Sequence, residues 1–191
     1  MTDSLLIRKG TLAIVAILCA SVFSVPAKAD TEGPNSPHVV AGKPFGYCYA
    51  RSVPDHYYLQ KGVTQVFQVT AKARDQPLFE FDWYSGNIYL YCNYGGDDLG
   101  ASLSLVRMGK WPRGSKASAD ELAMEFYHGG KLVGSYSTLD IAGSPDNVQR
   151  SVSHYRVIES VSGLDYSNTF KVTTVDGRTL TFDTRTGQLT K

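Results

Sequence analysis

The sequence predicts a mainly β protein, an antiparallel β-sandwich or a partly open barrel built from hairpins, with at most one or two short helical turns. Three observations lead to this class. The 191 residues include 12 tyrosines, all after position 46, and many valines and threonines, which favour pleated sheet surfaces. In the strand expected over 78–84, apolar and polar side chains alternate strictly from Phe79 onward. Glycine-containing turn sequences recur between short apolar runs.

The N-terminal segment reads as a secretory signal peptide covering residues 1–29. Arg8 and Lys9 precede an apolar run over 12–25, and the small residues Ala27 and Ala29 form a cleavage site before Asp30. We therefore expect export to the periplasm or the extracellular medium. An uncleaved anchor is the alternative, although the run is shorter than the roughly 20 apolar residues of a membrane span. No later run approaches that length, so we expect a mature form that does not span a membrane.

The charge balance disfavours a nucleic-acid partner. Three of the 19 Lys and Arg and one of the 18 Asp and Glu fall in residues 1–29, which leaves the rest of the chain at a net charge of −1. Non-specific nucleic-acid binding depends on clustered cations that neutralise phosphates. No glycine loop for phosphate, nucleotide fingerprint or haem motif is found, so we expect no cofactor.

The cysteines predict one disulfide. Cys19 lies within the signal peptide, which leaves Cys48 and Cys92 as an even pair in an oxidising compartment. Their long spacing resembles no C-x-x-C redox motif, and nothing nearby in the sequence would activate a thiolate. Because Cys92 shares a strand face with Ile88 and Leu90, Cys48 should approach it from the core.

The first half of the chain is expected to form a flexible tail followed by strands of a single β-rich domain over 45–191. The tail, residues 30–44, is polar and rich in Pro and Gly. The turn sequence Ser85-Gly86-Asn87 predicts a hairpin between 78–84 and 88–92. The other expected strands are 45–49, 63–70 and 101–108.

The second half begins with a polar break at 109–118, a possible sub-boundary within the domain. A capping box from Ser118 to Glu121 permits one helical turn, but a hairpin around Gly129-Gly130 is favoured. Residues 137–142 predict a helical turn capped by Ser137 or Thr138. The remaining elements are a strand over 155–161, an Asp-Gly turn between strands 169–175 and 179–183, and a weaker turn at Gly187 before a last short strand.

Tyrosine clustering is the main surface signal, and it gives the candidate binding residues. In the expected hairpin Tyr84, Tyr89 and Tyr91 lie on the face opposite Cys92, with Tyr94 beside them, and Trp111 in the polar break is a further candidate contact. Exposed tyrosines would form a platform for a sugar or a protein partner. The alternative is that they form cross-strand pairs or lie under another layer, and Trp111 tucks into the junction.

One carboxylate pair suggests catalysis. Glu80 and Asp82 share a strand face about 7 Å apart, a separation compatible with the acid and base of a glycosidase. The simpler interpretation is the solvated face of a strand, which predicts the same alternation.

The histidines and aspartates indicate no metal site. No H-x-H, H-E-x-x-H or C-x-x-C spacing is present. Asp97-Asp98 in a glycine-rich loop is a Ca²⁺-binding alternative, but the loop lacks an EF-hand or RTX-type pattern. Ser153-His154 invites a nucleophile–base interpretation. Neighbours on a strand face opposite sides, however, so we expect these two side chains not to meet.

The sequence thus favours an exported, non-enzymatic binding protein that uses its tyrosine face to contact an envelope or extracellular protein, or a glycan. The alternative is a secreted hydrolase or lyase that acts on a glycan through Glu80 and Asp82.

Overall fold

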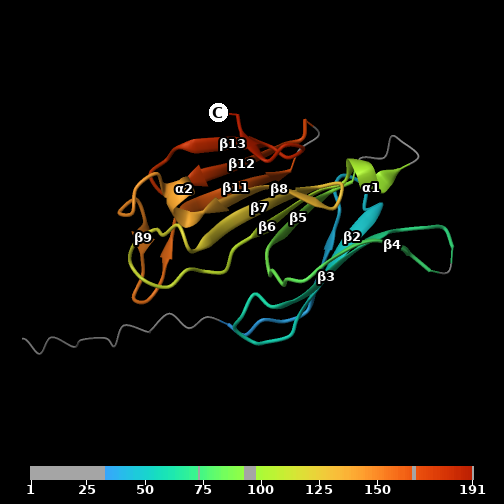
Figure 1. Ribbon diagram of the computed structural model, residues 1–191, viewed down its shortest axis with the longest axis horizontal. Coiled ribbons are helices and arrows are strands. Elements are labelled where there is room, and N and C mark those ends of the chain that lie inside the picture. The colour runs from blue at the N-terminus through green and yellow to red at the C-terminus, as the bar shows by residue number, and fades with distance from the viewer. Residues whose placement is uncertain (1–32, 73, 93–97, 165–166, 191) are drawn as a thin grey trace, which may run out of the picture.

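The computed structural model describes residues 33–72, 74–92, 98–164 and 167–190, and it is mainly β (Figure 1). The described residues contain three four-stranded antiparallel sheets and one two-stranded ribbon. None of these sheets closes into a barrel. The architecture is that of a β-sandwich, so the predicted fold class is confirmed. Two short helices accompany the strands in this part of the chain.

The N-terminal sheet has the order β1-β2-β3-β4. Its strands are β1 (His38–Ala41), β2 (Cys48–Pro54), β3 (Gly62–Gln68) and β4 (Gln76–Phe81). The predicted tail is wrong for residues 38–41, because this stretch pairs with β2, with Val40 opposite Ala50. The alternation of exposed and half-buried side chains in β1 suits an edge strand lying against a core.

The central sheet has the order β5-β6-β7-β8. Its strands are β5 (Ile88–Tyr91), β6 (Ser104–Met108), β7 (Leu122–His128) and β8 (Lys131–Ser137). The predicted hairpin of β7 and β8 is confirmed. Gly129 and Gly130 turn it with φ values of 54° and 75°, in the left-handed region that glycine adopts at little cost.

The predicted hairpin between 78–84 and 88–92 is wrong. Strand β4 pairs with β3, and β5 pairs with β6, so the intervening residues carry the chain from one sheet to another. Buried Ser85 holds this crossing: its hydroxyl donates to the carbonyls of Asn87 and Met108, at 3.0 and 2.9 Å. Alternation located both strands, although β4 covers 76–81 where 78–84 is predicted, but it carries no information about which strands pair.

The polar break at 109–118 joins β6 to β7 within one sheet and does not separate two units. Ala117 is buried in the core, and the backbone N–H of Gly109 donates to the carbonyl of Ala123 at 2.8 Å. Residues 119–120 form a turn that leads directly into β7, as the hairpin prediction requires.

Both helices are single turns with clear caps. Helix α1 (Leu99–Ser102) begins after Asp98, whose carboxylate accepts the N–H of Ala101, so the strand expected from 101 begins only at Ser104. Helix α2 (Thr138–Ala142) confirms the predicted turn. Ser137 is its N-cap, in a capping box with Asp140.

The C-terminal sheet has the order β11-β12-β13-β14, and a ribbon of β9 and β10 precedes it. These strands are β9 (Gln149–Arg150), β10 (Tyr155–Arg156), β11 (Ile158–Leu164), β12 (Thr169–Thr174), β13 (Thr179–Asp183) and β14 (Gln188–Leu189). The turns predicted at Gly177 and Gly187 are confirmed, whereas the strand predicted over 155–161 is divided between β10 and β11.

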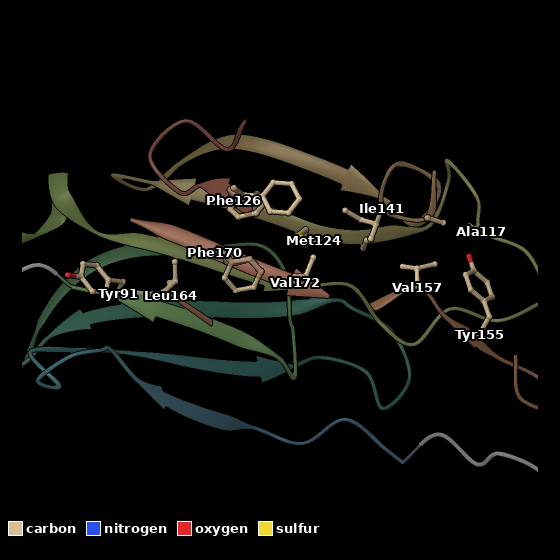
Figure 2. Packing of buried hydrophobic residues seen from close by; sticks show 14 residues of the cluster. Tyr91, Ala117, Met124, Phe126, Ile141, Tyr155, Val157, Leu164, Phe170 and Val172 are labelled. Carbon is tan, nitrogen blue, oxygen red and sulfur yellow. The ribbon is translucent and has the colours of Figure 1, made fainter. Parts of the chain in front are cut away.

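The three sheets form successive layers, because the central sheet is buried on both faces (Figure 1). One face, with Leu90, Leu105 and Tyr127, packs against Ala50 and Val66 of the N-terminal sheet. The other face packs against the C-terminal sheet, and Figure 2 shows Phe126 and Met124 on one side of that core and Phe170 and Val172 on the other.

Candidate functional site

The predicted tyrosine platform is not an exposed surface. Tyr84 is buried, and its hydroxyl donates to the carbonyl of Ser36 at 3.0 Å. Tyr91 is buried in the core, and Tyr89 is half-buried with its ring 5.2 Å from that of Phe170. Burial raises the pKa of the Tyr89 hydroxyl. Tyr94 lies outside the described residues.

The C-terminal sheet covers Tyr89 and Tyr91, as the alternative interpretation predicts, whereas Tyr84 is buried beside the segment that contains Ser36. The strand alternation itself was correct, since Tyr91 faces one core and Cys92 faces the other. The sequence contains one signal of two-sided burial: Leu105 and Val106 are adjacent apolar residues, so they point to opposite faces of β6. Both are fully buried in the structure. Strands covered on both faces typically have runs of adjacent apolar residues.

Among the predicted contact residues that the structure describes, Trp111 alone is substantially exposed, at 40%. Its segment is tied to the β9–β10 ribbon by two backbone hydrogen bonds, from Tyr155 N–H to the Pro112 carbonyl and from Gly114 N–H to the Ser153 carbonyl. The indole ring stacks on the ring of His154, with centroids 4.5 Å apart and planes 22° apart. One face of Trp111 is therefore seated on the protein.

The expectation that Ser153 and His154 do not meet is wrong. The Ser153 hydroxyl lies 2.8 Å from Nδ1 of His154. Residues 152–153 form a bend between β9 and β10, so the opposite-face rule for neighbours on a strand does not apply to them. Ser151 closes this bend, with its hydroxyl donating to the carbonyl of His154.

The Ser153–His154 pair lacks the arrangement of a catalytic triad. His154 is 2% exposed, and its Nε2 is buried without a hydrogen-bond partner in the described residues. A triad needs a third group that orients the ring through its second nitrogen, and none is present there. The His154 ring instead supports the indole of Trp111, and Ser153 holds its Nδ1.

Three hollows meet at Trp111. The first, of about 420 Å³, lies between the central and C-terminal sheets and includes Tyr89, Thr138 and Arg156 in its lining. The second, of about 140 Å³, includes Tyr58 and Leu59. The third, of about 370 Å³, is lined with Trp111 by Gln149, Arg150, Ser151 and Arg156. We call this surface the Trp111 site.

The loop over 55–61, between β2 and β3, supplies an apolar rim to the Trp111 site. Tyr57, Tyr58 and Leu59 are 69%, 52% and 45% exposed. Asn35 holds this loop by donating from its side-chain amide to the carbonyls of His56 and Leu59, at 3.1 and 2.8 Å. No spacing rule could place Tyr58 and Leu59 beside Trp111, because about 50 residues separate them in the sequence.

Glu80 and Asp82 do not form a paired catalytic site. Both carboxylates are exposed, and Glu80 accepts a hydrogen bond from the Gln65 amide at 2.8 Å. The groove of about 200 Å³ beside β4 has Glu80 in its lining but not Asp82. A glycosidase pair must flank one substrate bond in a shared cleft.

The described residues contain no group of three or more His, Cys, Asp or Glu placed to hold a metal ion. Asp98 is engaged in capping α1, and Asp97 is outside the described residues. No helix in the described part of the chain has the length and apolar character needed to cross a membrane.

Comparisons with protein-family models, with curated proteins and with solved structures find no match to this chain.

Proposed function

We propose that this protein is an exported, non-enzymatic binding protein whose contact surface is the Trp111 site. The observation that carries the proposal is the position of Trp111, an exposed indole seated on buried His154 where three hollows meet. Such an aromatic anchor offers a large contact area at a low entropic cost, because its conformation is held before the ligand arrives.

This proposal moves the binding surface away from the tyrosine face of β5. Tyr89 remains part of it, because it lines the largest hollow together with Trp111. Tyr58 and Leu59 add exposed apolar area on the other side of the indole. The partner is an envelope or extracellular protein or a glycan.

The binding proposal is tested by comparing capture of envelope components by the purified protein and by three variants. Trp111→Ala and Tyr58→Ala remove groups of the Trp111 site. Phe45→Ala is the matched control, since Phe45 is an aromatic residue, 67% exposed, that does not line the three hollows.

We expect Trp111→Ala to weaken capture by about tenfold or more, as for an interface hot spot, and Phe45→Ala to leave it unchanged. Thermal unfolding of each variant shows whether it is folded. Capture that is equal for the protein and a folded Trp111→Ala variant would refute the proposal.

Export rests on the signal-peptide pattern of residues 1–29. Cell fractionation with N-terminal sequencing tests it, and we expect an exported chain that begins at Asp30. Recovery of the protein in the cytoplasm with its first 29 residues retained would contradict this part of the proposal.

A further inference from the structure

The Trp111 site carries an unusual charge arrangement, formed by two segments that are distant in sequence. Residues 109–119 and 147–158 contain five Lys and Arg and no Asp or Glu, in a chain whose net charge is close to zero. Two contacts hold the segments together. The backbones of Arg113 and His154 form an isolated antiparallel β-bridge, and the ring of Trp111 stacks on that of His154. The fold therefore places Lys110, Arg150 and Arg156 in the lining of hollows that also contain the exposed indole.

We propose that the Trp111 site binds an acidic glycan, a chain of sugars bearing carboxylate, sulfate or phosphate groups. This inference rests on the proposed function and specifies its ligand class. The apolar face of a sugar ring would stack on Trp111, and the acidic groups would lie in the hollow of about 370 Å³ beside it.

The lining of that hollow matches an anionic, hydroxyl-rich ligand. Besides Trp111, its lining consists of two guanidinium groups, one amide and one hydroxyl, and it includes no carboxylate. Arg150 and Arg156 each offer five N–H donors in a fixed plane, the geometry that pairs with carboxylate, sulfate or phosphate oxygens. Gln149 and Ser151 can hydrogen-bond sugar hydroxyls.

The two guanidinium groups are held in place and keep donors for a ligand. Arg156 donates to the Gln149 amide oxygen at 2.5 Å and pairs with Glu159 at 2.8 Å. Arg150 pairs with Asp146 at 3.2 Å. The side chain of Arg156 nevertheless remains 45% exposed, and that of Arg150 remains 50% exposed. Each arginine thus has one side anchored and another open to solvent.

The rim contains carboxylates, and these select against very dense polyanions. Glu121 lies 3.8 Å from Lys110, and Asp146 and Glu159 pair with the arginines of the hollow. A nucleic acid carries a charge on every nucleotide and binds mainly through many phosphate contacts. A mixed rim with a single exposed indole better matches a chain in which sugar rings and acidic groups alternate.

The test uses the purified protein, its tryptophan fluorescence, and a panel of defined oligosaccharides. The panel contains a galacturonic-acid oligomer, sulfated and phosphorylated oligosaccharides, and the neutral galactose oligomer of equal length. Poly-glutamate and single-stranded DNA represent other polyanions. The chain has two tryptophans, so Trp111→Phe assigns the signal.

We expect at least one acidic oligosaccharide to bind more tightly than the neutral oligomer, poly-glutamate and DNA. The double variant Arg150→Gln/Arg156→Gln should weaken acidic binding by about tenfold or more, the loss expected for two charge-assisted contacts. The control Lys131→Gln/Lys171→Gln removes the same charge from two exposed lysines on β8 and β12 and should leave binding unchanged.

Three results would overturn the ligand assignment: binding to none of the acidic oligosaccharides, equal affinity for the neutral oligomer, or equal affinity for poly-glutamate or DNA. An unchanged affinity in the double arginine variant would also overturn it. In each case capture that still depends on Trp111 would leave the proposed function standing. Acidic-glycan binding that is insensitive to Trp111→Ala would instead reject the Trp111 site itself.

Discussion

Cys48 and Cys92 form a disulfide that joins the N-terminal sheet to the central sheet, with their Cα atoms 6.3 Å apart. Cys48 begins β2, Cys92 follows β5, and both are buried in the core between these two layers. The backbone N–H of Cys92 also donates to the Lys43 carbonyl at 2.9 Å. The disulfide therefore links two layers whose strands belong to separate sheets and are otherwise joined here by the isolated bridge between Lys43 and Tyr91.

Replacing both cysteines by serine should lower the free energy of unfolding by about 3–4 kcal/mol, the chain-entropy value for a closed loop of this size. The cysteines are 44 positions apart, so the unfolded chain gains considerable freedom when the link is lost. Chemical denaturation in the presence and absence of a thiol reductant measures the effect. Wild-type protein that loses no stability on complete reduction would contradict this role.

Arg178 connects the turn between β12 and β13 to the end of helix α2. Its guanidinium donates to the carbonyls of Ile141 and Ala142, at 3.0 and 2.7 Å, and pairs with Asp176 at 2.7 Å. Hydrogen bonds from a charged donor contribute about 1.5–3 kcal/mol each when intact. Arg178→Ala should therefore destabilise the protein measurably in chemical denaturation, whereas Arg185→Ala, whose pair with Asp183 is local and exposed, should have little effect.

Acid should weaken the Asp176–Arg178 pair. Hydrogen bonds from Arg178 and from the Thr174 hydroxyl hold the pKa of the Asp176 carboxyl below its usual value. A carboxyl whose pKa is lower in the folded state stabilises the fold above its unfolded value of about 3.9, and this contribution is lost as the pH falls through the folded value. Asp176→Asn should therefore flatten the decline in stability below about pH 4. An unchanged pH profile would argue against the pair.

High pH should lower the stability of the protein through Tyr127, which lies on the face of the central sheet that packs against the N-terminal sheet. Burial raises the pKa of its hydroxyl, and the hydrogen bond to Glu125, at 2.6 Å, raises it further. A tyrosine with a raised folded pKa stabilises the fold below its unfolded pKa of about 10 and loses this contribution as the pH rises above it. Tyr127→Phe should reduce the alkaline loss of stability. Ultraviolet titration of the folded variant should show one fewer tyrosine that ionises only well above the usual pKa.

The core between the central and C-terminal sheets should be sensitive to truncation of Phe126. This ring is fully buried, with the Phe182 ring 5.1 Å away and the Phe170 ring 5.8 Å away. Phe126→Ala should cost about 3–5 kcal/mol because it leaves a cavity that the sheets cannot fill. Leu132→Ala, at a 54% exposed position on β8, is the control and should change stability by less than about 1 kcal/mol.

Several features were predictable because their causes are local. The Gly129-Gly130 turn, the Ser137 cap of α2 and the alternation that separates Tyr91 from Cys92 depend on residues within a few positions of each other. The site was predictable only in part. Trp111 was identified as a candidate contact, but its neighbours Tyr58, Arg150 and Arg156 come from elements far away in the chain.

The wrong hairpin and the covered tyrosine face share one physical cause, which is long-range packing, whereas the contact of Ser153 with His154 results from a local bend. Adjacency in the sequence predicts one hairpin from the 78–84 and 88–92 strands, yet β4 pairs with β3 and β5 pairs with β6, so the two strands lie in different sheets. The open tyrosine face follows from the alternation of β5 alone, which does not show whether a second sheet covers that face; the adjacent apolar residues Leu105 and Val106 are the local sign of such a cover. Ser153 and His154 meet because the chain bends there to place His154 under Trp111.

The sequence by itself determined the β class, the main turns and the pairing of Cys48 with Cys92, because side-chain period, glycine conformation and cysteine count are properties of the chain. The tertiary structure alone decided which strands pair, that the central sheet is buried on both faces, and that cations from two distant segments surround Trp111. These outcomes depend on the burial of apolar surface between layers, a long-range free energy that no local pattern encodes.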